Sequence, residues 1–596
     1  MKRVKIIFIF LIIFIFNFTA YAMPSRQQII QFSQPTGETF DAKIMGDDKI
    51  SWVETTDGEV ISQGEDGYWY YSQLNNGELI KSSSKYLIDK KTDKYLTGKK
   101  FLSSQYIKKY SRIQKSVPAK SMTNNNIQPI LVVLVEYSDI SLKYDLKEWN
   151  NLIFNFQYDS LNSYYNEVSQ GKLIFEPANE FYEENDGIVK IKINKNHPNP
   201  ERLTLTQSQK DDIYQNMVKD IINSVDNYID FSSFDKNKDK VISTDELHLI
   251  LVIAGYERSY SYTSLPSVWG HKWGLYNGIT LDGVRLLDEN FGGSYIMIGE
   301  RHSDHMATVG IIAHEIGHNL GLPDLYDVDG SSLGVGIHSL MGLGSWAYDT
   351  GYPGSKPTHL DAWSKVKLGF VEPKIFDSIG YVTLNSILSG SYNIVKILTK
   401  NVGEYFLIEN RQFEGFDIGL LGYLNNGGIA IWHIDENIIE NNPYEINSNE
   451  YHKGVDLEEA NEGKLGYSQL DRNKTNEVYD HYYYVGNNIT FDMTTRPNSN
   501  LYDGTSSHLR INVLDNSSSS MRVKIELLDK YGDLDRDGRI TNSDLQMLKN
   551  MFLSNSPQLE NLIADVNGDD KVTISDYVII KQYVLNKINS FPVNNK

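Results

Sequence analysis

The stretch that decides the fold and chemistry of this chain runs His314-Glu-Ile-Gly-His318-Asn-Leu-Gly321-Leu-Pro-Asp324. Apolar spacing predicts a helix over 306–320, capped by Ser303 or Asp304 and ended by Gly321. Residues four apart on a helix share a face, so both imidazoles can bind one Zn²⁺ while Glu315 points at the metal's open position. An acidic residue six positions after His318 can supply a third coordination bond.

The third zinc ligand has two candidates, Asp324 and Asp327, and the six-residue spacing favours Asp324. The alternative to a metal site is a helix whose two histidines are ordinary core or surface residues. Downstream, Ser339-Leu340-Met341-Gly342 is similar to the methionine turn beneath the zinc of metzincins. That resemblance makes Tyr348 a candidate donor to an oxyanion, with structural packing of its ring as the alternative.

Zn²⁺ with three protein ligands keeps a fourth position for water and lowers the pKa of that water to about 7. Glu315 beside the metal can take the proton as the water attacks a peptide carbonyl. The expected reaction is therefore hydrolysis of a protein or peptide substrate, with Glu315 and Tyr348 as the candidate catalytic residues.

Three further strings carry a family resemblance. These are Pro357-Thr-His-Leu-Asp-Ala-Trp-Ser-Lys365, Glu409-Asn-Arg-Gln412 and Trp432-His-Ile-Asp-Glu436. With the zinc motif they closely resemble the immune inhibitor A family of secreted metallopeptidases, over about 130–459. The resemblance implies one catalytic zinc and aspartate as its third ligand. The alternatives are an inactive scaffold-associated binding protein, against which intact Glu315 argues, and a metal-dependent hydrolase of another extracellular polymer.

Composition excludes several classes of protein function and of site. The 596 residues carry 57 Lys and Arg against 77 Asp and Glu, a net charge of −20, which excludes a typical nucleic-acid binder. Cysteine is absent, which excludes disulfides, thiolate zinc sites and cysteine nucleophiles. Residues 1–22 have the basic, apolar and Ala-Tyr-Ala order of a cleavable signal peptide, and the apolar run is short for a membrane anchor. We expect a secreted extracellular protein with no membrane span after signal cleavage.

Two loops near the C-terminus, 32 residues apart, have the spacing of EF-hand calcium loops, with oxygen ligands at positions 1, 3, 5, 7 and 12. The ligands expected are Asp533, Asp535, Asp537, Arg539 and Asp544 in the first loop, and Asp565, Asn567, Asp569, Lys571 and Asp576 in the second. Each loop leads into one helix, and the duplicated unit is similar to a type I dockerin. The resemblance implies two Ca²⁺ ions, a cohesin partner on a scaffoldin and attachment to a cellulosome-type complex at or near the cell surface. A calcium-stabilised tail without a partner is the alternative.

A third segment, 235–246, also fits the calcium template. Its expected ligands are Asp235, Asn237, Asp239, Val241 and Glu246, and the alternative is an ordinary acidic turn.

The fold class expected is multi-domain α+β. After the signal peptide we expect a small β-rich N-terminal prodomain over 23–115, an exposed linker over 116–128 and a mixed α/β, metzincin-like catalytic domain over 129–372. A β-rich, sandwich-like domain over 373–528 and an all-α, calcium-binding dockerin over 529–590 complete the chain. With no thiol to block the zinc, latency of this zymogen would rest on an acidic residue or on steric cover of the cleft.

Overall fold

The structure is a computed structural model of the chain. It describes residues 21–22, 24–25, 29–47, 51–75, 78–89, 95–98, 101, 126–202, 204–261, 264–376, 380–399, 401–474, 478–527, 531–534, 539–554, 562–569 and 571–595. Most of the predicted signal peptide and residues 116–125 of the predicted linker lie outside this described part.

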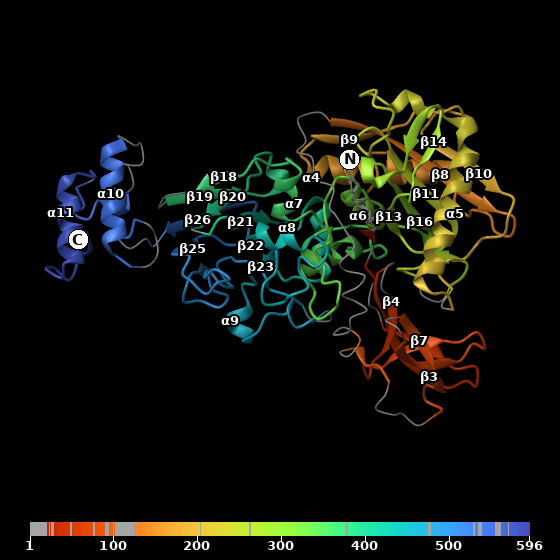
Figure 1. Cartoon of the computed structure of the whole chain (residues 1–596), viewed down its shortest axis with the longest axis horizontal. Helices are drawn as coiled ribbons and strands as arrows, with labels where there is room; N and C mark the ends of the chain where they lie inside the picture. Colours follow the sequence, from red (N-terminus) through yellow and green to blue (C-terminus); the bar gives the residue numbers. More distant parts are fainter. Residues whose placement is uncertain are drawn as a thin grey trace, which may run out of the picture.

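The N-terminal region is one antiparallel sheet of six strands, drawn in red in Figure 1. Its strands are β2 Ile30–Ser33, β3 Thr39–Gly46, β4 Ser51–Thr55, β5 Val60–Gln63, β6 Trp69–Asn75 and β7 Glu78–Lys85. Alternating apolar residues line one face, where Phe32 packs edge-on against Trp69 at 5.1 Å between ring centroids. Trp269, which comes from the next domain, belongs to the same buried cluster.

The central domain is built on a mixed sheet in the order β1-β13-β16-β11-β8-β10. Its strands are β1 Tyr21–Ala22, β8 Asn126–Tyr137, β10 Ile188–Ile193, β11 His248–Glu257, β13 His271–Trp273 and β16 Tyr295–His302, with β9 Leu173–Pro177, β12 Ser267–Val268 and β17 His305–Met306 beside them and the separate hairpin β14 Ile279–Leu281 and β15 Val284–Leu286. Strands β10, β8, β11 and β16 are parallel, whereas β13 runs antiparallel to β16. The antiparallel strand β13 thus lies next to the edge of the sheet.

Helices cover both faces of this sheet, because the parallel strands are apolar on both sides. Helix α5 Gln207–Val225 packs on one face. Helices α3 Leu146–Ile153, α4 Leu161–Val168 and α6 Val309–Asn319 pack on the other face. Helix α6 carries the predicted zinc motif, and its residues are all buried.

Three local expectations differ from the structure. The helix of the zinc motif begins at Val309 and not at residue 306, and its N-cap is Thr308 and not Ser303 or Asp304, because His305–Met306 pair back onto β16 as β17. Gly321 follows its end with φ +93°, as predicted. The linker ends before residue 126, because Asn126 already pairs with β9 and Gln128 is buried.

The β-rich region contains two packed sheets (Figure 1). The first has the order β18-β20-β21-β22-β23 and the second β19-β26-β25-β24. Their bounds are β18 Lys374–Phe376, β19 Gly380–Asn385, β20 Val395–Leu398, β21 Glu404–Arg411, β22 Gly428–Asp435, β23 Val455–Leu457, β24 Thr490–Phe491, β25 Leu509–Val513 and β26 Ser520–Leu527, with the short helices α7 Ala362–Lys367, α8 Glu436–Asn441 and α9 Glu462–Leu465 around them. One core joins the two sheets. The other face of the first sheet contributes Leu407, Ala430 and Trp432 to the core that also holds α6.

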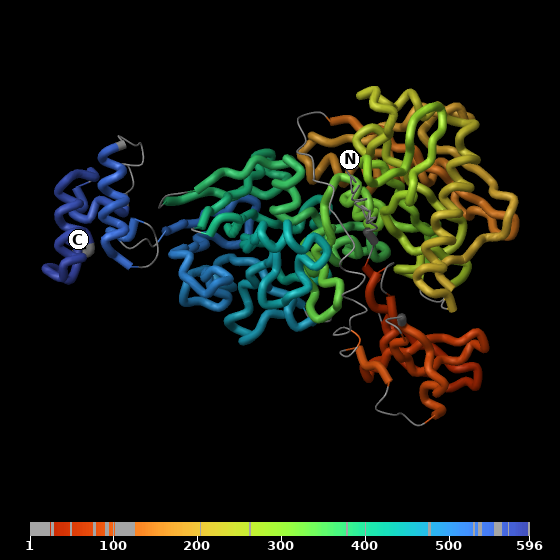
Figure 2. The backbone as a smooth tube through the Cα atoms, in the orientation of Figure 1, coloured from red at the N-terminus to blue at the C-terminus, as the bar shows by residue number. Residues whose placement is uncertain are grey.

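The C-terminal module stands apart from the other domains, as the blue end of the tube in Figure 2 shows. Helices α10 Asn542–Ser554 and α11 Ile574–Val584 pack on a small core that includes Leu548, Ile580 and Phe591. Phe591 is buried and Val593 donates its N–H to Val566, so the packed unit extends past residue 590. In the described part of the chain, no helix has the length and apolarity needed to span a membrane.

Candidate metal centre

Three potential metal ligands converge at α6. The Nε2 atoms of His314 and His318 lie 3.1 Å apart, and each lies 3.3 Å from Oδ1 of Asp324. A tetrahedral Zn²⁺ with bonds of about 2.0–2.1 Å holds neighbouring ligand atoms about 3.3 Å apart. The three atoms therefore fit a zinc ion, and among the described residues this is the one group of three or more His, Cys, Asp or Glu side chains arranged to hold a metal.

Backbone carbonyls fix both imidazoles. His314 donates from Nδ1 to the carbonyl of Leu340 at 2.9 Å, and His318 donates from Nδ1 to the carbonyl of Leu322 at 2.8 Å. Each ring then turns its unprotonated Nε2 to the centre, the tautomer that a metal ligand requires. The carbonyl of Leu340 belongs to the predicted methionine turn.

The protonation states of the group suit metal binding. Burial lowers the pKa of His318 to about 4, so its ring is neutral at neutral pH. Burial alone would raise the pKa of Asp324, yet the imidazoles of His318 and His314 that face its carboxylate hold that pKa below its ordinary value. Neutral imidazoles and a charged carboxylate are the forms that bind a cation.

Asp327 does not join the group of three. Its carboxylate accepts hydrogen bonds from the backbone of Asp329 and Ser332 and from the hydroxyl of Ser331, at 2.7–2.9 Å. Burial raises the pKa of Asp327 to about 7. Asp327 therefore closes its own loop, and Asp324 is the acidic residue that the fold brings to the histidines.

The two candidate catalytic residues have different surroundings. Glu315 is fully buried on α6 beside His314. Tyr348 follows the 3-10 turn Leu343–Trp346 and is 36% exposed, so its ring is not part of the core.

The predicted calcium loops share a hydrogen bond from the backbone N–H at position 9 to the carboxylate at position 12. In the first C-terminal loop, the position-12 carboxylate of Asp544 accepts from the backbone N–H groups of Leu534 and Thr541, at positions 2 and 9. In the second loop, Asp576 accepts from Asn567 and Thr573, at positions 3 and 9. Asp533, Asp544, Asp565 and Asp576 are all buried. Of the other predicted ligands, Asn567 is half-buried, Arg539, Asp569 and Lys571 are exposed, and Asp535 and Asp537 lie outside the described residues.

The loop at 235–246 follows the same pattern. Glu246 at position 12 accepts from the backbone of Lys236, Asn237 and Ser243, at positions 2, 3 and 9. Asp235 at position 1 accepts from the backbone of Asp239 and Lys240. Lys240 at position 6 has φ +66°, the left-handed conformation that glycine usually supplies there. The side chains of Asp235, Asn237, Asp239 and Glu246 and the carbonyl of Val241 thus belong to a loop of the calcium-binding shape.

Comparison with known proteins supports these features. Residues 155–370 match the model of the immune inhibitor A peptidase M6 catalytic domain, and residues 531–585 match the dockerin type I domain. Both resemblances predicted from the sequence are confirmed. The matched segments contain the three converging donors and the two C-terminal loops.

Two curated proteins are similar to part of this chain, and one of them is named as a metalloprotease. The pre-pro-metalloprotease PrtV of Vibrio cholerae serotype O1 (strain M66-2) is 32% identical over 124 residues, which are 20% of this chain and 13% of PrtV. Immune inhibitor A of Bacillus thuringiensis subsp. alesti is 29% identical over 148 residues, 22% of each chain. The chain thus spans less than a quarter of the length of these curated relatives. The wild-type crystal structure of OgpA from Akkermansia muciniphila aligns over 50% of this chain and 74% of that chain, with 13% identity and a TM-score of 0.21, too low to indicate a shared fold.

Proposed function

We propose that this chain is a secreted zinc endopeptidase that is delivered by a calcium-dependent dockerin to a cohesin-bearing scaffoldin. The observation that carries the catalytic part is the triangle of His314, His318 and Asp324, whose sides of 3.1–3.3 Å match tetrahedral zinc. The match of residues 155–370 to a peptidase domain supports the same reaction.

Zinc held by these three residues would supply a polarised substrate carbonyl and an acidified water. Glu315 follows His314 on α6 and acts as general base for the attacking water. It then returns the proton to the leaving amine of the peptide bond. Tyr348, which is partly exposed after the methionine turn, donates to the oxyanion that forms on the substrate.

Metal analysis of the purified chain and of His318→Ala tests the metal centre. We expect one zinc per wild-type chain at this site and none in the variant, because two remaining ligands do not hold the ion tightly. Zinc retained by His318→Ala would reject this ligand set.

The N-terminal sheet serves, in this proposal, as an inhibitory prodomain that covers the cleft. Three contacts support that role. The indole of Trp346 donates to the carbonyl of Pro24 at 3.1 Å, and Tyr326, two residues after Asp324, donates to Asp47 at 3.3 Å. Trp269, which directly follows β12, completes the core of the N-terminal sheet. The 3-10 turn that contains Trp346 packs against the metal-binding helix, and Tyr326 lies in the segment that follows this helix, so the cover would be steric.

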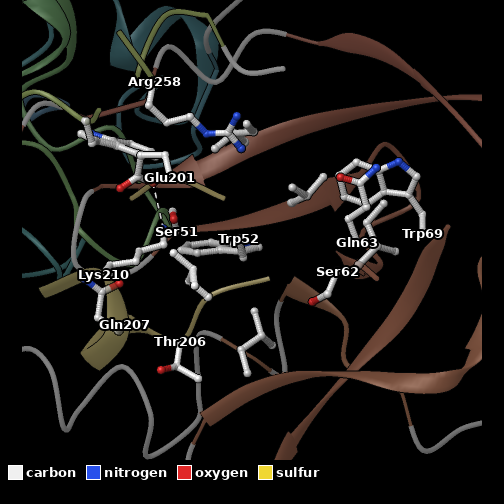
Figure 3. Close-up of a pocket in the computed structure, with 16 residues that line it drawn as sticks. Ser51, Trp52, Ser62, Gln63, Trp69, Glu201, Thr206, Gln207, Lys210 and Arg258 are labelled. Carbon is white, nitrogen blue, oxygen red and sulfur yellow. Dashed lines mark hydrogen bonds and ion pairs between the residues drawn. The ribbon is translucent and has the colours of Figure 1, made fainter. Parts of the chain in front are cut away.

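The interface between the two domains is incompletely packed. Figure 3 shows Ser51, Trp52 and Trp69 of the N-terminal sheet facing Glu201 and Arg258 of the central domain across a cavity. The cavity has a volume of about 110 Å³. A cavity at this interface is compatible, in this proposal, with a domain that leaves after cleavage of the connection before β8.

The C-terminal module carries the docking function in this proposal. Its match to the dockerin type I domain and the buried carboxylates of both loops support two Ca²⁺ ions and a cohesin partner. The partner's scaffoldin would hold the enzyme in an extracellular, cellulosome-type complex.

A third Ca²⁺ would bind at 235–246. The shared hydrogen-bond pattern and the left-handed Lys240 support this ion. Calcium analysis should give three ions per chain, and Glu246→Gln should give two, because it removes the charged position-12 ligand. A count of two Ca²⁺ ions in the wild type would mean that 235–246 is an ordinary acidic turn.

A further inference from the structure

Residues of two strings that carry the family resemblance meet in one buried cluster of charges. Lys365 of α7 lies 2.9 Å from Glu409 of β21. Arg411 of the same strand makes a two-pronged pair with Asp417, at 2.6 Å from Nε and 2.7 Å from Nη2. All four side chains are at most 2% exposed. The cluster lies between the β-rich region and the core that contains α6.

The Arg411–Asp417 pair holds the start of the methionine turn at two points. Arg411 donates from Nη1 to the carbonyl of His338, the residue before the turn, at 3.0 Å. Asp417 accepts the backbone N–H of His359 at 2.8 Å, and the carbonyl of His359 accepts the N–H of Leu340 at 3.1 Å. The same pair therefore fixes the backbone that leads into Leu340, at the carbonyl of His338 and at the N–H of Leu340.

The imidazole of His338 is held from the same region. Its Nδ1 lies 2.9 Å from the hydroxyl of Tyr482, and its Nε2 lies 2.8 Å from Nδ1 of His481. His338 is fully buried, so backbone and side chain together leave this residue little freedom to move.

The methionine turn fixes the orientation of the metal-binding residue His314. The carbonyl of Leu340 accepts the hydrogen bond from Nδ1 of His314 at 2.9 Å. A continuous path of contacts thus runs from Arg411 on β21, through the methionine turn, to the imidazole of His314. The noncovalent steps of the path are hydrogen bonds of 3.1 Å or less, and the covalent backbone of 338–340 and of His359 joins them.

A gain in folding stability is a weak explanation for the buried Arg411–Asp417 pair. Removing two charges from water costs about as much as their attraction returns. A guanidinium held at two points by a carboxylate does, however, fix direction in a way that apolar packing does not. We propose that Arg411 and Asp417 are positioning residues of the metal centre, which orient His314 through the carbonyl of Leu340. The inference rests on the proposed metal site, and it makes the β-rich region part of the active centre.

The test replaces the pair by neutral side chains of similar shape. Arg411→Gln with Asp417→Asn removes both charges together, so no buried charge is left unpaired, and Lys365 and Glu409 still balance each other. The matched control is Arg522→Gln with Asp515→Asn, a two-pronged pair of the same region at 2.7 and 3.0 Å that is exposed to solvent. Arg411→Lys is the conservative variant, which keeps the positive charge and loses the two-pronged hydrogen bonding to Asp417.

The readouts are the zinc dissociation constant, measured by chelator competition, and the visible absorption spectrum of the cobalt-substituted protein. We expect the neutral pair to weaken zinc binding by about 10- to 100-fold and to alter the cobalt spectrum, with Arg411→Lys between it and the wild type. The control should match the wild type. Unchanged zinc affinity and cobalt spectrum in the folded neutral pair, or in Arg411→Lys if the pair does not fold, would overturn the positioning role. A wild-type chain that binds no zinc would overturn the proposed function as well.

Discussion

The sulfur of Met341 lies directly against Gly317, so a β-carbon at this position of α6 would approach it to 2.5 Å. Met341 is fully buried below the helix that carries both histidines. The second variable position of the zinc motif is thus fixed by contact with the methionine turn, and not by helix propensity, which would favour alanine.

Gly317→Ala should therefore destabilise the catalytic domain by about 1–3 kcal/mol, because overpacking forces the helix and turn apart. Thermal unfolding measures the loss. Gly422→Ala is the matched control, since a β-carbon there meets no atom within 4 Å. Adding Met341→Ala to Gly317→Ala should recover part of the stability, and equal stability of Gly317→Ala and the wild type would contradict the contact.

Stability should also fall at alkaline pH because of His433. Burial disfavours its charged ring, but hydrogen bonds to Glu404 at 3.0 Å and Glu458 at 3.2 Å outweigh burial and raise its pKa to about 9. The folded pKa lies above the unfolded value of about 6.5, so this stabilisation is complete below pH of about 6.5 and is lost as pH rises through about 9. It amounts to at most about 3 kcal/mol.

Denaturant unfolding at pH 6 to 10 checks this dependence. The wild type should lose stability across that window, and His433→Gln should show a flatter profile. Profiles of equal slope would mean that His433 is not the group responsible.

Release of the N-terminal domain should activate the enzyme. A specific cleavage site placed within 116–125, before Asn126 begins β8, allows the same folded protein to be assayed before and after cutting. We expect hydrolysis of a protein substrate to rise at least about tenfold once the fragment is removed, because the contacts of Pro24 and Asp47 beside the cleft are lost. Equal rates would show that 23–115 is a permanent structural domain.

Cohesin binding should require calcium and tolerate loss of either docking face. Helix α10 begins at Asn542 and α11 at Ile574, so the two repeats present equivalent first turns, and Ile574 is 72% exposed. Changing Asn542 and Ser543 should leave binding largely intact, whereas changing Ile574 and Ser575 as well should abolish it. Calorimetry against a panel of cohesins, with and without chelator, decides this. Binding that survives chelator, or calcium-dependent folding without any cohesin bound, would contradict a docking role.

Local patterns predicted most of the metal centre. Helical spacing brought His314 and His318 to one face, and the turn after Gly321 is short enough to bring Asp324 back to them. The six-residue spacing favoured Asp324 over Asp327, but it does not encode the hydrogen bonds by which the carboxylate of Asp327 closes the following loop. The role of Tyr348 stays a prediction.

A local hairpin and a long-range contact explain where the prediction from sequence was wrong or incomplete. Residues His305–Met306 have an acceptable helical pattern, but pairing with β16 draws them into β17 and delays the helix. The support of the methionine turn by Arg411 joins residues 73 apart, from different domains, through a backbone carbonyl. No side-chain pattern along the chain predicts such a contact. The string Glu409-Asn-Arg-Gln412 contains Arg411, but in the sequence it indicates only the family resemblance.

The most direct test of the central claim is the zinc content and proteolytic rate of Glu315→Ala, with Glu372→Ala, an exposed residue, as control. We predict that Glu315→Ala keeps one zinc per chain and loses at least about two orders of magnitude in turnover, because the ligands remain and the general base is gone. The control should keep both zinc and turnover. Full activity of Glu315→Ala, or an active wild-type protein without stoichiometric zinc, would contradict the account.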